Sequence, residues 1–129
     1  QKRGFIMENI DTTSKFVTVL NRKIPIGVLI NALGHMLEGL VGAYPDIPKM
    51  RFDNYVDKNG GIHKSISDSP FIILAADNSN QIRTLRNILI AGQIHFNDFT
   101  NTMTVGTYVE QKARTQQTLE SELYRSYLN

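Results

Sequence analysis

The sequence predicts an α/β fold: a three-layer sandwich in which helices cover a mixed sheet of about four to five strands. Two observations carry this prediction. Short runs of β-branched and apolar residues alternate along the chain with longer amphipathic segments, and 41% of the 129 residues are apolar, enough to build a core. Because no internal repeat or linker interrupts the pattern, we expect one domain over residues 15–129, after a loose lead-in over residues 1–14.

The first strands are indicated by local composition. Lys15–Leu20 is apolar and β-branched, which is typical of a buried strand. Met50–Val56 and Ile62–Ile66 flank an Asn59-Gly60 pair. Asn-Gly between two strand-like runs favours a hairpin, because both residues tolerate positive φ angles.

Two more strands are expected later in the chain. Phe71–Ala75 is continuously apolar, which predicts an interior strand buried on both faces. Ile94–Phe99 resembles a further strand, and the polar stretch Thr100–Gly106 follows it as a loop. Loops after the strands of α/β sheets often bind ligands, although Thr100 and its neighbours could equally cap the next helix.

Helical periodicity predicts three helices: Val28–Leu40, Asn80–Ala91 and Glu110–Leu128. Asp77, Asn78 or Ser79 would cap the second helix, and Gly92 would end it as its C′ residue. The apolar face of the first helix contains Leu29, Leu33, Met36 and Leu40, with Asn31, His35 and Glu38 opposite. The inner faces of the other two contain Ile82, Leu85, Leu89, Leu119, Leu123 and Tyr127.

Composition excludes several classes of function. The chain has no cysteine, which rules out disulfides, thiolate metal sites and cysteine nucleophiles. No apolar run approaches the ~18 residues needed to span a membrane, and we expect a cytoplasmic protein with no membrane partner. The net charge of +2, from 14 basic and 12 acidic residues, gives only weak support to nucleic-acid binding. The three histidines lack metal-ligand spacing, so no metal and no cofactor is predicted.

The best candidate site lies on the first helix. Asn31 and His35 are four residues apart and share a face, and Gly27 at the helix start leaves backbone N–H groups accessible to an anion. Thr100 and Met103 follow the last predicted strand. We therefore predict a ligand-binding pocket formed by these five residues, with no catalytic residue assigned. The alternative interpretation is that the helix face is simply solvated.

Short motifs then point to a relative. They are Phe16-Val-Thr-Val-Leu-Asn21, Asn31-Ala-Leu-Gly-His35, Tyr55-x-Asp57-x-x-Gly60 and Phe99-Thr100-x-x-Met103-x-x-Gly106. Together they resemble the domain of unknown function family two thousand over roughly Lys15–Leu128. In fold that family is similar to the type-two peptidyl-tRNA hydrolases, which implies a mixed four-stranded sheet between helices.

The resemblance does not extend to the hydrolase chemistry. When His35 is placed on the histidine of those enzymes, Gly27 falls on their glycine. Val28, Ala32 and Lys23 then stand where the enzymes carry Lys, Gln and an acidic residue. Peptidyl-tRNA hydrolysis by that arrangement is therefore not expected, whereas the fold inference is unaffected.

Three functions follow as hypotheses. The first is a small-ligand-binding protein or an enzyme of undetermined reaction, with the pocket above. The second is an RNA- or tRNA-binding protein on a hydrolase-like scaffold. The third is a non-catalytic homo-oligomer, such as a homodimer, whose apolar faces form the interface.

Overall fold

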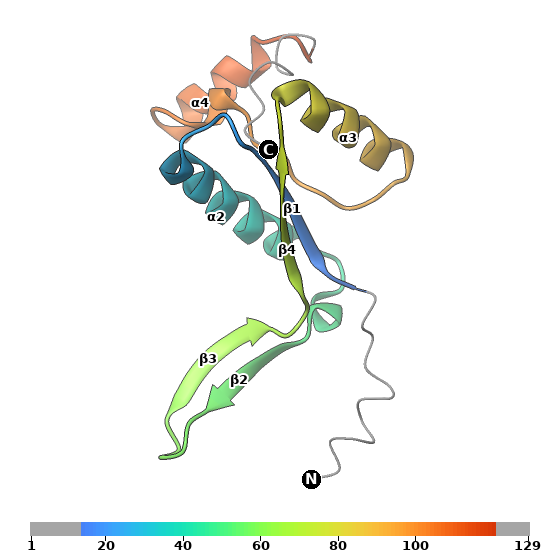
Figure 1. Cartoon of the computed structure of the whole chain (residues 1–129). Helices are drawn as coiled ribbons and strands as arrows, with labels where there is room; N and C mark the ends of the chain where they lie inside the picture. Colours follow the sequence, from blue (N-terminus) through green and yellow to red (C-terminus); the bar gives the residue numbers. More distant parts are fainter. Residues whose placement is uncertain (1–13, 121–129) are drawn as a thin grey trace. The chain divides into compact units, whose positions relative to one another are not determined.

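The computed structural model describes residues 14–120 and shows a mixed α/β protein (Figure 1). Within this range three helices accompany four short strands, which form two separate two-stranded sheets. The chain divides into two compact units, one with residues 14–17 and 45–72 and the other with residues 18–44 and 73–120. Each unit is described by itself below.

Strand β1 (Phe16–Asn21) pairs with strand β4 (Phe71–Ala76). The backbone N–H of Phe16 donates to the carbonyl of Pro70, and that of Arg22 donates to the carbonyl of Ala76, each at 2.9 Å. Donor and acceptor are separated by the same number of residues in both bonds. The two strands therefore run parallel, side by side (Figure 1).

The burial predicted for β4 is wrong. Phe71, Ile73 and Leu74 have exposed fractions of 43%, 60% and 51%, and only Ala76 of this strand is buried. A strand is covered on both faces only in a wider sheet with helices on each side, and β4 has β1 as its single strand neighbour among residues 14–120. The predicted single mixed sheet of four to five strands is therefore wrong: the described residues form two separate two-stranded sheets.

Helix α2 (Ile26–Ala43) follows β1 after a short turn and is longer than the predicted Val28–Leu40. Its buried residues are Leu29, Ala32 and Met36, so the core face is turned slightly from the predicted one. In the described range, α2 is also the one helix that is long and apolar enough, by composition alone, to cross a membrane. This is weak evidence, because core helices of soluble proteins meet the same test.

The larger hydrophobic cluster of the second unit forms where α2 packs on β1. It contains Leu20, Leu29, Ala32, Met36 and Phe99, with the partly buried Ile24 and Met103 against it. Phe99 enters this cluster from the distant segment after α3, which fixes that segment beside α2. A smaller cluster joins Ile82 to Ala76 and Val19.

Helix α3 (Ser79–Ala91) begins as predicted at a side-chain cap, since Asn78 accepts a hydrogen bond from the backbone N–H of Gln81 at 3.0 Å. Its end differs from the prediction. Gly92 keeps a right-handed backbone with φ of −84°, and Gln93 takes the left-handed conformation with φ of 54°.

The segment 94–99 is extended but is not the strand that the sequence predicts. Its position is fixed by side-chain contacts and not by the backbone hydrogen bonds of a sheet. His95 packs edge-on against Tyr44, and Asn97 and Asp98 form hydrogen bonds to neighbouring helices. The short 3-10 helix η3 (Asn101–Met103) follows.

Helix α4 (Tyr108–Gln116) starts two residues before the predicted Glu110 because Thr107 and Glu110 form a capping box. The helix ends at Gln116, earlier than predicted, and Leu119 is exposed. The expected inner positions Leu123 and Tyr127 lie outside the described residues.

In the first unit, β2 (Phe52–Val56) and β3 (Ile62–Ser67) form the predicted antiparallel hairpin, after the 3-10 helix η2 (Ile47–Met50). Only Gly60 takes a positive φ, of 85°, so the turn is a three-residue loop rather than a two-residue one. Asp57 closes the turn by accepting hydrogen bonds from the N–H groups of Asn59 and Gly61 at 2.9 and 2.8 Å.

Candidate functional site

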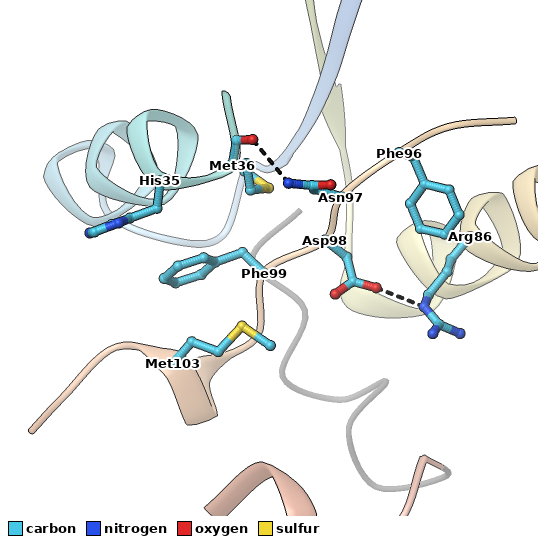
Figure 2. Close-up of a pocket in the computed structure, with 8 residues that line it drawn as sticks. All are labelled: His35, Met36, Arg86, Phe96, Asn97, Asp98, Phe99 and Met103. Atoms are coloured by element: carbon cyan, nitrogen blue, oxygen red, sulfur yellow. Dashed lines mark hydrogen bonds and ion pairs between the residues drawn. The ribbon is translucent and has the colours of Figure 1, made fainter. Parts of the chain in front are cut away.

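A pocket of about 490 Å³ lies in the second unit, between α2, α3 and the segment that leads into η3 (Figure 2). Ligand pockets in proteins commonly have volumes of about 300–1,000 Å³. The pocket is open to solvent, and its lining combines aromatic rings and thioethers with an amide, an imidazole and an ion pair. The lining residues are His35, Met36, Arg86, Phe96, Asn97, Asp98, Phe99 and Met103.

Two consecutive side chains fasten the pocket segment to two different helices (Figure 2). Nδ2 of Asn97 donates to the backbone carbonyl of Met36 on α2 at 3.1 Å. Asp98 accepts from Nε of Arg86 on α3 at 2.7 Å. Because successive side chains of an extended segment point in opposite directions, one short stretch can hold both helices.

A glycine on α2 permits this close approach. A Cβ atom added at Gly39 would lie 2.8 Å from Nδ2 of Asn97, nearer than real Cβ contacts come. The amide could not then reach the Met36 carbonyl without moving. The absence of a side chain at Gly39 therefore leaves room for the hydrogen bond that positions the pocket segment.

His35 stacks on Phe99, with ring centroids 6.1 Å apart and planes inclined by 20°. Phe99 is buried, whereas the His35 side chain is 58% exposed. Nδ1 of His35 lies 3.2 Å from Oε1 of Glu38, one turn along α2. This contact orients the imidazole at the rim of the pocket.

The Arg86–Asp98 ion pair is the most enclosed charged group of the pocket. The two side chains are 29% and 23% exposed. The pair brings one positive and one negative charge into the same wall, so the wall carries no net charge. Neither in the pocket nor elsewhere in residues 14–120 does a cluster of three or more His, Asp or Glu side chains occur that could hold a metal ion.

The five predicted site residues have different positions. His35 and Met103 line the pocket. Thr100 is 1% exposed and its hydroxyl bonds that of Thr102 at 2.6 Å, which in turn bonds Thr115 on α4 at 2.8 Å. Gly27 and Asn31 are exposed on α2 and do not line the pocket.

Six residues that line the pocket were not predicted as site residues: Met36, Phe99, Arg86, Phe96, Asn97 and Asp98. A sequence signal was present for the last two. Asn97 and Asp98 form a polar pair inside an otherwise strand-like run, where a buried strand would not tolerate it. Arg86 had no comparable signal, since an arginine on a helix is ordinarily solvated.

Comparison with known families gives a match over residues 14–125 to the family described as "Protein of unknown function (DUF2000)". The chain belongs to this family. The match covers far more than half of the sequence and includes every residue that lines the pocket. It agrees with the resemblance that the short motifs indicate, and it assigns no activity.

Among solved structures, the DUF2000 chain is similar to a protein of unknown function, Atu0240, from Agrobacterium tumefaciens strain C58. The TM-score is 0.72 at 14% sequence identity, over 88% of this chain and 82% of the other. At this identity the likeness concerns the fold alone. A search of curated proteins gives no match.

Proposed function

We propose that this DUF2000 protein binds a small organic molecule in the pocket between α2, α3 and the 96–103 segment. The observation that supports the proposal is a hollow whose lining combines an imidazole, an amide and an ion pair with aromatic rings and thioethers (Figure 2). Small-molecule sites commonly combine apolar walls with a few fixed polar groups.

A fragment library tests this proposal by ¹⁵N-resolved NMR on the full chain. We expect binders to shift the amide resonances of Asn97, Asp98 and Phe99, with smaller effects on the β2–β3 hairpin. The variant Phe99→Leu, which removes the ring beneath His35, should weaken those binders. Val109→Leu, at an exposed position of α4, is the matched control. A library without a single binder at these residues would refute the proposal.

Self-association is a second candidate function, favoured by an apolar stripe on α2. The stripe, called the α2 seam here, contains Ile26, Ile30, Leu33, Leu37 and Leu40 at alternating spacings of four and three residues. Ile26 and Ile30 are 68% and 60% exposed, and the three leucines are half-buried. The seam contains no charged residue, so pairing with a second copy opposes no like charges.

Light scattering after gel filtration tests the seam. We expect a dimer that becomes a monomer in Ile30→Lys but not in Val109→Lys, whose parent side chain is equally exposed at 60%. A chain that is monomeric at every concentration, or an equal effect of both variants, would rule out this interface.

Two finer statements belong to the same proposal. We propose a scaffold like that of the type-two peptidyl-tRNA hydrolases, supported by the parallel β1–β4 pair and the intervening helix. We also propose a cytoplasmic location without membrane contact, supported by Asn31, His35 and Glu38 on α2, which would be costly in lipid.

A further inference from the structure

We infer that Asn59, in the loop between β2 and β3 (Figure 1), is a site of spontaneous deamidation and that the Asp57 turn controls the rate of this reaction. The modification concerns the first unit and is independent of the pocket. Its basis is an Asn-Gly pair in an exposed loop, together with a backbone hydrogen bond that occupies the nitrogen required for the reaction.

Deamidation of an asparagine needs no enzyme and no cofactor. The backbone nitrogen of the following residue loses its proton to hydroxide and attacks Cγ of the asparagine side chain, and the side-chain nitrogen leaves as ammonia. Water then opens the resulting five-membered succinimide at either of its carbonyls. One opening gives aspartate, and the other gives isoaspartate, in which the main chain runs through the former side chain. In the net reaction, an amide and water become a carboxylic acid and ammonia.

Asn59 is the one asparagine in the 129 residues that is followed by a glycine. A following residue with a Cβ atom crowds the attacking nitrogen, whereas Gly60 has none. A Cβ atom built at Gly60 would meet nothing within 4 Å, so the space beside this nitrogen is open. Asn59 is itself exposed, and its side-chain amide is bonded to no other group within residues 14–120. The two reacting groups are therefore accessible to water.

The folded turn restrains the reaction. The backbone N–H of Gly60, which is the attacking group, donates to the carbonyl of Asp57 at 3.0 Å. The Asp57 carboxylate holds the same turn, because it accepts from the N–H groups of Asn59 and Gly61 at 2.9 and 2.8 Å. A bonded N–H is not free to lose its proton or to move onto Cγ of Asn59. The reaction therefore proceeds from the opened turn, and its rate follows the population of that state.

Both products weaken the turn that restrained the reaction. An aspartate at position 59 adds a second carboxylate two residues from that of Asp57, and like charges this close repel each other. An isoaspartate adds a methylene group to the main chain between Asp57 and Gly61, so the hydrogen bonds that close the three-residue loop no longer fit. Deamidation is thus expected to lower the protection of the Gly61 amide against exchange.

Peptide mapping by mass spectrometry tests the site. The full chain is kept at mildly alkaline pH and sampled over time, and enzymatic methylation of isoaspartate distinguishes the two products. We expect conversion at Asn59 and not at Asn54, an exposed asparagine of β2 that is followed by tyrosine. Conversion at Asn59 that is no faster than at Asn54 would overturn the inference.

Two variants should change the rate in opposite directions. Asp57→Ala removes the carboxylate that holds the turn, so conversion at Asn59 should be about fivefold faster, the population change that one net hydrogen bond corresponds to. Gly60→Ala places a Cβ atom beside the attacking nitrogen and should slow conversion, even though the φ of 85° strains an alanine and loosens the turn. Asp53→Ala removes an exposed carboxylate from the same hairpin and should leave the rate unchanged.

Denaturation separates the effect of the turn from that of the sequence. In concentrated guanidinium chloride the turn is absent, so the parent chain and Asp57→Ala should convert at the same rate, which is faster than that of the folded parent. Equal rates for the two folded chains, or a difference that persists in the denaturant, would overturn control by the turn. His63→Ala, which removes only the 3.0 Å contact to Oδ2 of Asp57, repeats the test with a smaller expected acceleration should Asp57→Ala fail to fold.

Discussion

Gly39 and Gly34 occupy the same helix but have different surroundings. A Cβ at Gly39 would meet Nδ2 of Asn97 at 2.8 Å, whereas a Cβ at Gly34 would meet nothing within 4 Å. A helix-interior glycine costs roughly 0.5–1 kcal/mol relative to alanine. The two positions therefore form a matched pair that isolates the packing of the pocket segment against α2.

We predict that Gly34→Ala stabilises the chain by about 0.5–1 kcal/mol, because it lowers the entropy of the unfolded state without a clash. Gly39→Ala should be less stable than Gly34→Ala by about 0.5–1.5 kcal/mol, the net value of the lost Asn97 hydrogen bond. Urea unfolding of both variants at low protein concentration measures this difference. Equal stabilities would show that the Asn97–Met36 bond contributes nothing.

The pocket residues also show which part of a site a sequence reveals. His35 stands out because helical spacing places it on the polar face of α2. Asn97 could not be linked to α2 in the same way, since it bonds Met36 across 61 positions of sequence. The sequence likewise did not reveal that Thr100 is buried and that its hydroxyl bonds to that of Thr102, so its role at a ligand site stays a prediction.

The Asp57 turn is the element whose stability should depend on pH. Hydrogen bonds from the backbone of Gly61, from His63 and from the backbone of Asn59 hold the pKa of the Asp57 carboxyl below its ordinary value of 3.8. A lowered folded-state pKa stabilises the turn at pH values above the unfolded-state pKa. That stabilisation is lost as the pH falls from the ordinary value through the lower folded one.

We therefore predict that acidification opens the hairpin turn, detected as weaker protection of the Gly61 amide against exchange, relative to its intrinsic rate, and as an upfield shift of its resonance below the ordinary pKa of Asp57. In Asp57→Asn this pH dependence of the Gly61 amide should disappear. Asp53→Asn, on the same hairpin, should retain it. An unchanged Gly61 profile in Asp57→Asn would contradict the role assigned to the carboxylate.

The capping box of α4 gives a second prediction for an element. Thr107 accepts from the N–H of Glu110, and the Glu110 side chain accepts from the N–H of Thr107. Thr107→Ala should destabilise the protein by about 0.5–2 kcal/mol, as for other lost N-caps. Urea unfolding measures the cost, and Thr84→Ala, within α3, serves as the comparison. A smaller cost for Thr107→Ala than for Thr84→Ala would contradict the cap.

Elements with local signals could be predicted from the sequence, and those that depend on distant partners could not. Asn59-Gly60 predicts the hairpin because the turn conformation is a property of a few residues. The segment 94–99 has a strand-like composition. Its position is nevertheless fixed by side-chain hydrogen bonds to α2 and α3, and not by backbone hydrogen bonds to a neighbouring strand. The burial of β4 depends on how many strands flank it, which its own composition does not encode.

For the molecule as a whole, family membership and fold are established, and neither specifies a reaction. We predict that the purified full chain hydrolyses peptidyl-tRNA no faster than background, because Val28 and Ala32 replace the polar residues implied by the hydrolase resemblance. Release of the labelled peptide from a peptidyl-tRNA measures this. A rate that disappears in His35→Ala would show that the scaffold catalyses the reaction by another arrangement.

The most direct measurement is a crystal structure of the full chain grown with a library fragment that shifts the amide resonances of Asn97, Asp98 and Phe99. The pocket described here predicts density for the probe against residues that line it, such as Asp98, Phe99 and Met103. The Arg86–Asp98 pair should remain beside it. A crystal in which the segment 94–99 or its side chains fill the hollow, with the probe elsewhere or absent, would contradict the pocket as a ligand site.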